Sequence, residues 1–112
     1  NNFLSLGTAT FVIETLKAAD KLGIDLKKLY DVAKLGSGNS GALNRIAEKA
    51  LNNDYKGYIF SVNNTLKDLT YINELLKDMP NAEKLSSVAK SFYEEAKAKG
   101  YGDLLISELI KK

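Results

Sequence analysis

Apolar residues recur at three- and four-residue spacing along most of the chain, which predicts an all-α fold. In the first half of residues 1–22 the apolar residues lie on nearly all sides of the expected helix, and in the second half they lie on one face. This pattern is typical of a central helix that other helices cover. Gly23 can end this helix, because glycine readily adopts the left-handed conformation. Asp25 can then cap a second helix that extends to Leu35.

A glycine-rich stretch, residues 36–41, separates the second helix from the third. It follows a helix rather than a strand and lacks the Gly-Lys-Ser/Thr ending of a phosphate-binding loop, so we interpret it as a turn. Asn39 or Ser40 can cap the third helix, over residues 42–51. Residues 52–61 are polar and aromatic without a helical period, which predicts a loop.

Two longer helices and a short one complete the chain. A fourth helix over residues 62–79 is broken at Pro80, Asn81 can cap a fifth helix up to Lys99, and Asp103 can cap a short sixth. No segment alternates as a strand does, so we expect about six helices packed around the first. The predicted buried stripes are Leu26, Leu29, Tyr30 and Ala33, then Leu66, Leu69, Ile72, Leu75 and Leu76, then Leu85, Val88, Ala89, Phe92 and Ala96.

The composition is that of one globular domain. The chain has 112 residues, of which 45% are hydrophobic and 27% charged, enough for one core but not for two. The net charge is +2 and the lysines are scattered, which argues against nucleic-acid binding. No segment has the length and apolarity of a membrane span or the pattern of a signal peptide, so we expect a cytoplasmic protein.

The chain contains neither cysteine nor histidine. This composition excludes disulfide bonds, thiolate chemistry and the usual ligand sets for zinc, copper and iron. The carboxylates also lack the spacing of a calcium-binding loop, so we expect no metal site. Histidine is the commonest general base, and it is absent as well.

Two polar pairs stand out from the pattern of an ordinary helical domain. Asn1 and Asn2 precede an apolar helix, although asparagine is a mediocre helix former. Lys67 and Asp68 lie near the start of the fourth helix, where the helix dipole disfavours a cation. Each pair taken alone is compatible with ordinary exposed residues, so the residues by themselves leave the function open.

The order and spacing of several short motifs resemble those of one enzyme family. The motifs are Asn1-Asn2 with Glu14, Lys21-x-Gly23-Ile24-Asp25, Gly36-Ser37-Gly38-x-Ser40, Phe60 seven residues before Lys67-Asp68-Leu69, and Tyr93 followed by Gly100-x-Gly102-Asp103. Over essentially the whole chain they resemble the C-terminal helical domain of the β-hydroxyacid dehydrogenases. That family includes 3-hydroxyisobutyrate dehydrogenase, tartronate semialdehyde reductase and the succinic semialdehyde/glyoxylate reductases.

The resemblance implies that residues 1–112 are the second domain of a two-domain enzyme. In the family a Rossmann domain binds NAD or NADP, and a long helix leads from it into the helical domain. The catalytic Lys of the family stands four residues before the position of Asn2, on the same helical face. It acts as general acid/base while hydride moves between substrate and nicotinamide. Because the chain starts inside an apolar helix, we expect a fragment of a longer protein. Without the Rossmann domain and the catalytic Lys it should be inactive alone, and its exposed apolar first helix should favour self-association.

The resemblance also implies roles for four residues of this chain. Asn2 orients the substrate, Phe60 and Asp68 help to close the substrate pocket, and Lys67 reaches the bound cofactor. Glu14 matches a glutamate that we interpret as structural. The site would lie at the interface of the two domains, a common place for a ligand pocket. The substrate would be a small hydroxyacid or semialdehyde, and the enzyme a homo-oligomer.

The chain departs from the family in two places. Leu105 stands where many members have an acidic residue, two positions after the match to Asp103, and the loop over residues 52–57 is short. A relative of 6-phosphogluconate dehydrogenase is a weaker match, because Asn1 stands where that group has histidine.

A hypothesis of a different class is a self-contained helical interaction module without catalysis. We adopt the dehydrogenase interpretation. The identity of the acid and the choice between NAD and NADP depend on residues outside this chain.

Overall fold

The computed structural model describes residues 1–112 and confirms the expected all-α fold. Its elements are α1 (Asn2–Lys21), α2 (Leu26–Ala33), α3 (Gly41–Ala50), α4 (Val62–Leu75), α5 (Pro80–Ala98) and the 3₁₀ helix η1 (Ile106–Lys111). The only β-type pairing is an isolated bridge between Ser61 and Leu105. No helix is long and apolar enough to cross a membrane.

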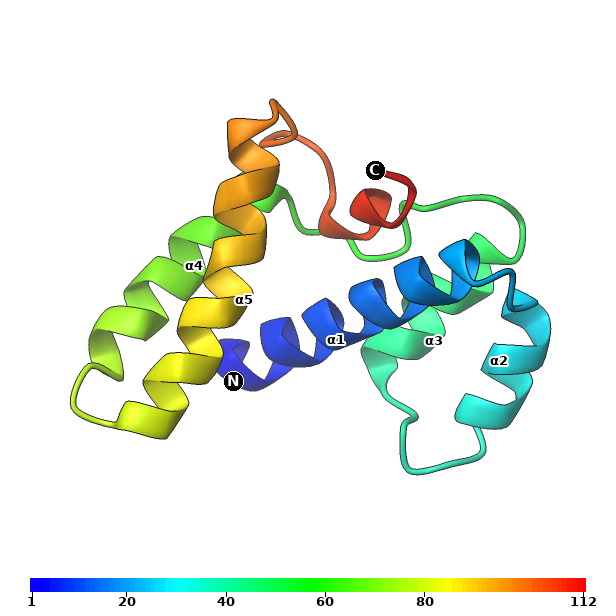
Figure 1. The fold of residues 1–112 in the computed structure, drawn as a ribbon, viewed down its shortest axis with the longest axis horizontal. Coiled ribbons are helices and arrows are strands. Elements are labelled where there is room, and N and C mark those ends of the chain that lie inside the picture. The colour runs from blue at the N-terminus through cyan, green and yellow to red at the C-terminus, as the bar shows by residue number, and fades with distance from the viewer.

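Helix α1 is the centre of the molecule, as its apolar pattern predicts. It runs through the middle of the fold, with α4 and α5 beside its first half and α2 and α3 beside its second half (Figure 1). It contacts all the other helices, including η1. Its buried residues are Leu6, Ala9, Thr10, Val12, Ile13, Leu16 and Ala19. These side chains join residues of every other helix in one hydrophobic core.

A buried polar pair fixes α5 against α1. Tyr93 is only 1% exposed, and its hydroxyl lies 2.6 Å from Oγ1 of Thr10. Thr10 donates its own hydrogen to the carbonyl of Leu6 at 2.7 Å, so the Tyr93 hydroxyl is the donor in the pair. Burial raises the pKa of Tyr93 to about 12, and the nearby carboxylate of Glu14 adds to the rise.

The caps predicted for the first three helices are largely confirmed. Gly23 follows α1 with a φ of +72°, a conformation that glycine adopts without strain. Asp25 accepts a hydrogen bond from the backbone N–H of Lys27, and Ser40 rather than Asn39 caps α3 through the N–H of Leu43. Helix α2 ends at Ala33, two residues earlier than expected.

The predicted boundaries around Pro80 are wrong. Helix α4 ends at Leu75, four residues before Met79, and Pro80 is the first residue of α5. Proline is well suited to that position, because a first-turn N–H has no partner within the helix. Asn81 therefore lies inside α5 and does not cap it.

Asp103 does not cap the last helix, contrary to the prediction. Its carboxylate accepts a hydrogen bond from the side-chain amide of Asn63 at 3.1 Å. The 3₁₀ helix begins three residues later, and the Glu108 carboxylate accepts the N–H of Leu105 at 3.0 Å. Asp103 thus connects the terminal segment to α4.

The predicted buried faces of α4 and α5 are partly wrong. Leu85 is 62% exposed, and Leu75, Val88 and Phe92 are exposed as well. Helix α5 buries Ala89 and Ala96, as predicted, together with Ser86 and Tyr93, which the predicted stripe did not include. Asn73 of α4 accepts hydrogen bonds from Ser86 and Ser87, so the α4–α5 contact is partly polar.

The displaced apolar residues of α5 line a groove beside α1, which we call the apolar groove. Its volume is about 450 Å³, and its large apolar side chains are Phe3, Leu4, Phe11, Leu69, Leu85, Val88 and Phe92. Phe11 is 75% exposed there. The central helix is therefore covered on most sides but open along this groove.

We predict that residues 1–112 self-associate through the apolar groove, because exposed apolar surface gains free energy by burial. The midpoint of thermal unfolding of the isolated chain should then fall on dilution. Phe11→Gln should weaken this concentration dependence. Leu35→Gln is the control, since Leu35 is 87% exposed and lies outside the groove. A monomer with a concentration-independent midpoint would contradict the prediction.

We also predict that Tyr93 makes the stability of the domain sensitive to alkaline pH. In the unfolded chain Tyr93 ionises near pH 10.0, but in the fold only near pH 12. The contribution of Tyr93 to the free energy of unfolding is therefore complete below pH 10 and is lost as the pH rises towards 12. Near pH 11.5 the loss should be about 2 kcal/mol.

Urea unfolding at about pH 9 and about pH 11.5 measures this loss. At the lower pH, Tyr93→Phe should lower the free energy of unfolding by about 1 kcal/mol, because one hydrogen bond is lost. The variant should then lose less stability between the two pH values than the unchanged protein does. Tyr71→Phe, at an exposed tyrosine, should behave as the unchanged protein does. Equal alkaline losses in all three proteins would refute the assignment.

Candidate functional site

A cavity of about 470 Å³ opens where the start of α1 meets α3, α4 and the loop before α4. We call it the Asn2 cavity. Its lining residues are Asn2, Ser5, Leu6, Arg45, Gly57, Tyr58, Ile59, Phe60 and Asp68. Three of the four residues predicted to form the site therefore lie around one space, although they come from three separate segments.

A hydrogen bond joins two of these residues across 66 positions of sequence. The side-chain amide of Asn2 donates from Nδ2 to Oδ2 of Asp68 at 3.1 Å. An ionised carboxylate can only accept, so the nitrogen of the Asn2 amide must be the atom that faces Asp68. The carbonyl oxygen of the amide is then left to accept a hydrogen bond from a ligand.

The first turns of α1 set the position of Asn2. Asn2, Ser5 and Leu6 stand three and four residues apart, so their side chains share one face of the helix. Leu6 is buried in the core and anchors that face. The two polar residues are therefore held beside the cavity by Leu6, the first buried residue of α1.

The C-terminal segment holds the loop that carries Phe60. The N–H of Ile106 donates to the carbonyl of Phe60 at 2.9 Å, and the N–H of Val62 donates to Leu104 at 2.8 Å. Ser107 is fully buried, and its hydroxyl donates to the carbonyl of Tyr55 at 2.6 Å. These contacts fix the backbone on both sides of Phe60.

Gly57 allows the same loop to lie directly on α3. A Cβ atom added to Gly57 would lie 2.3 Å from the carbonyl oxygen of Arg45 and 3.1 Å from Cα of Ile46. Both of these are backbone atoms of a helix and cannot move aside. The close approach places Gly57 and Arg45 side by side in the cavity wall.

Lys67, the predicted cofactor ligand, does not line the cavity. It is exposed on α4, next to Asp68 in the sequence, and takes part in none of the ion pairs of the structure. Its ammonium group is therefore free to bind an anionic ligand from outside the domain.

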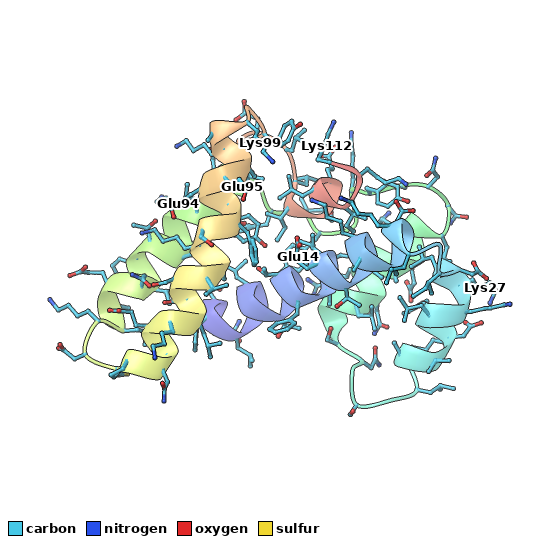
Figure 2. All side chains as sticks on the ribbon, viewed as in Figure 1. Glu14, Lys27, Glu94, Glu95, Lys99 and Lys112 are labelled. Atoms are coloured by element: carbon cyan, nitrogen blue, oxygen red, sulfur yellow. The ribbon has the colours of Figure 1, made fainter.

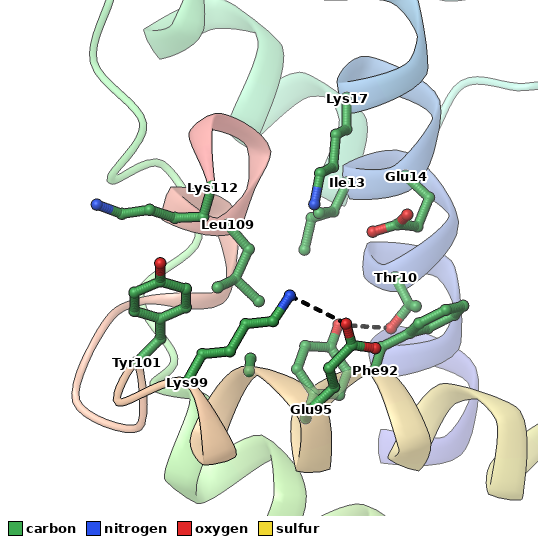
Figure 3. Close-up of a pocket in the computed structure, with 12 residues that line it drawn as sticks. Thr10, Ile13, Glu14, Lys17, Phe92, Glu95, Lys99, Tyr101, Leu109 and Lys112 are labelled. Carbon is green, nitrogen blue, oxygen red and sulfur yellow. Dashed lines mark hydrogen bonds and ion pairs between the residues drawn. The ribbon is translucent and has the colours of Figure 1, made fainter. Parts of the chain in front are cut away.

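A second, smaller cavity of about 190 Å³ lies between α1, α5 and η1. Figure 3 shows the amines of Lys17 and Lys99 pointing into it, and Lys99 forms an ion pair with Glu95 at 3.0 Å. Glu14, interpreted from the sequence as structural, lines this cavity and not the Asn2 cavity.

The charged side chains as a whole are spread over the surface. In Figure 2, Lys27 projects from α2 at one end of the molecule, and Glu94, Glu95 and Lys99 lie along α5 at the other. The structure contains no group of three or more carboxylates, histidines or cysteines that could hold a metal ion.

Sequence reasoning did not find six residues of the Asn2 cavity: Ser5, Leu6, Arg45, Gly57, Tyr58 and Ile59. Ser5 could have been included, because it stands one turn after Asn2. Arg45 is the only arginine in the chain, which is a weak signal. Nothing in the local pattern shows that the loop crosses α3 at Gly57.

The whole chain, residues 1–112, matches the family described as NAD-binding of NADP-dependent 3-hydroxyisobutyrate dehydrogenase. The chain belongs to the 3-hydroxyisobutyrate dehydrogenase family. The resemblance inferred from the short motifs is thereby confirmed, and with it the use of NAD or NADP by the family.

Two relatives of known activity are much longer than this chain. It is 33% identical over 98 residues to L-threonate dehydrogenase from Haemophilus influenzae, covering 88% of this chain and 32% of the relative. The crystal structure of a 3-hydroxyisobutyrate dehydrogenase from Salmonella typhimurium superposes with a TM-score of 0.84 at 26% identity. That match covers 98% of this chain and 38% of the other. The chain thus spans about a third of the length of these relatives.

We predict that Gly57→Ala destabilises the domain, because the added methyl group collides with the backbone of α3. The loss in the free energy of unfolding should be about 1–3 kcal/mol, as for other overpacked sites. Gly38→Ala is the matched control, since Gly38 is a loop glycine with open space around it. Urea unfolding of both variants measures the difference, and equal stability of the two would show that the loop does not press on α3.

Proposed function

We propose that residues 1–112 form the C-terminal, substrate-binding domain of an NAD(P)-dependent dehydrogenase. The enzyme would oxidise a small 3-hydroxyacid or reduce the corresponding semialdehyde or glyoxylate. The observation that carries this proposal is the Asn2–Asp68 hydrogen bond in a cavity that Phe60 also lines. It brings together residues that the family resemblance assigns to the substrate but that lie far apart in the sequence.

Asn2 and Asp68 would bind the reacting end of the substrate. The free carbonyl oxygen of Asn2 can accept a hydrogen bond from a substrate hydroxyl. The family resemblance places the catalytic lysine one helical turn before Asn2, where its amine would share that hydroxyl and transfer its proton. Phe60 would supply an apolar wall that limits the access of water.

Lys67 fits the role of a cofactor ligand. The bound dinucleotide supplies the hydride acceptor or donor of the reaction. Lys67 is exposed and free of ion pairs, so its ammonium can pair with a phosphate of NAD or NADP. This use of Lys67 agrees with a family described as NAD-binding.

The apolar groove supports a homo-oligomeric enzyme as part of the same proposal. A symmetric contact between two copies would place the same apolar patch on each side of the interface. An apolar patch can pack against its own copy without complementary charges. The groove is also the one feature that favours the alternative function, a helical interaction module without catalysis. Turnover by the complete protein distinguishes the two functions.

The test is an activity assay of the full-length protein with NADH and NADPH against small semialdehydes and glyoxylate. Lys67→Ala should raise the KM for the cofactor about 10-fold or more with little change in kcat, because a charge-assisted contact is lost. Asp68→Ala should lower kcat/KM for the substrate by about 10–100-fold, since it removes both a cavity-lining charge and the partner of Asn2.

Two exposed residues without ion pairs serve as controls, Lys84→Ala for the lysine and Asp78→Ala for the aspartate. Both should leave the kinetic constants unchanged. A full-length protein without turnover on any of these compounds, and indifferent to all four substitutions, would favour the interaction module.

A further inference from the structure

One side chain from outside the loop, residues 52–61, holds the part of the loop that precedes Phe60. Ser107 of η1 is fully buried, and its hydroxyl donates to the carbonyl of Tyr55 at 2.6 Å and accepts the N–H of Tyr58 at 3.2 Å. No other backbone group of residues 55–59 forms a hydrogen bond with a residue outside the loop. One hydroxyl therefore holds the chain on both sides of Gly57.

The same hydroxyl is connected to Phe60 through the backbone. The N–H of Phe60 donates to the carbonyl of Tyr58 at 2.9 Å, and the N–H of Ile106 donates to the carbonyl of Phe60 at 2.9 Å. Two neighbouring residues of η1 thus hold the backbone of Phe60 from its N–H side and from its carbonyl side. Because the rotamers open to a side chain depend on its backbone angles, these contacts determine how Phe60 lies in the cavity wall.

The loop has no second contact that could replace Ser107. Neither the carbonyl of Tyr55 nor the N–H of Tyr58 has another hydrogen-bond partner. Without the hydroxyl, both groups would need water, and the segment would have to move to reach it. Gly57 lies within this segment, directly on the backbone of α3, so the movement would shift the wall of the Asn2 cavity.

We propose that Ser107 positions Phe60 in the wall of the Asn2 cavity and so sets the affinity of the enzyme for its substrate. This inference rests on the proposed function, in which Phe60 closes the substrate pocket. Ser107 does not line the cavity, so it is a positioning residue that acts through the loop. A misplacement of about 1 Å caused by a distant substitution can lower a rate by about 100-fold.

The first experiment measures steady-state kinetics of the full-length enzyme with a small semialdehyde or glyoxylate. Ser107→Ala should raise the KM for the substrate about 10-fold, because the displaced wall binds the substrate less well. It should change the KM for the cofactor less than about 2-fold, since the cofactor ligand Lys67 lies on α4 and not on the loop.

Ser86→Ala is the matched control for the loss of a buried hydroxyl. Ser86 is fully buried as well, and its hydroxyl lies 2.7 Å from Oδ1 of Asn73 and 3.0 Å from the carbonyl of Glu83. It belongs to α5 and does not line the Asn2 cavity. Ser86→Ala should therefore lose stability as Ser107→Ala does, but keep both KM values at temperatures below unfolding.

A double-mutant cycle tests whether Ser107 acts through Phe60. Ser107→Ala is measured again in the Phe60→Ala enzyme, in which no aromatic ring is left to be misplaced. The 10-fold effect on the KM for the substrate should then shrink to less than about 3-fold, because coupled residues do not act additively. Equal fold-changes in the two backgrounds would refute the proposal.

Hydrogen exchange of the full-length enzyme supplies a readout without turnover. The backbone amide of Tyr58, which donates to Ser107, should exchange at least about 10-fold faster in Ser107→Ala and at the unchanged rate in Ser86→Ala. Unchanged exchange at Tyr58 in Ser107→Ala would mean that the hydroxyl does not hold the loop.

The outcomes separate this inference from the proposed function. If the unchanged enzyme turns over the substrate but Ser107→Ala keeps both KM values, the role of Ser107 is refuted and the proposed function stands. An equal rise of the KM for substrate and cofactor would also refute it, because a general structural fault affects both. Absence of turnover in the unchanged protein would overturn the proposed function, and the role of Ser107 with it.

Discussion

The burial of α1 by all the other helices is the constraint on which the rest of the structure depends. Its apolar face spans several directions, so the core closes only when α2 to α5 and η1 all pack against it. The Thr10–Tyr93 hydrogen bond fixes one of these contacts in register. Leu6 is the first buried residue of this helix, and it lies one turn after Asn2.

The candidate site is assembled from segments that only the tertiary structure brings together. Helix α1 contributes Asn2, the second turn of α4 contributes Asp68, and the intervening loop contributes Phe60. The loop has no regular structure of its own, and it is ordered by Gly57 against α3 and by backbone pairing with residues 104–106. The cavity therefore depends on contacts that are distant from it in the sequence.

Much of the fold could be predicted from the sequence because its determinants are local. The period of α1, Gly23 after it, and the caps Asp25 and Ser40 act within one or two turns. The predicted face of α5 is right at Ala89 and Ala96 but wrong at Leu85, because the neighbouring Ser86 faces inward and bonds Asn73 of another helix. Pro80 begins α5 rather than ending α4, since proline fits either side of a helix boundary.

At the site, the family resemblance selected Asn2, Phe60 and Asp68, whose roles remain predictions. Arg45 enters the cavity wall only because the loop crosses α3 at Gly57.

The pairing of residues 60–63 with residues 102–106 determines when the cavity can form during synthesis. A chain leaves the ribosome from its N-terminus, so α1 to α4 emerge well before residue 106. Until Gly102, Leu104 and Ile106 are available, the backbone of residues 60–63 lacks these three hydrogen bonds. Contacts of such long sequence separation form late, because a large loop must first be closed. The Asn2 cavity is thus among the last parts of the nascent domain to become ordered.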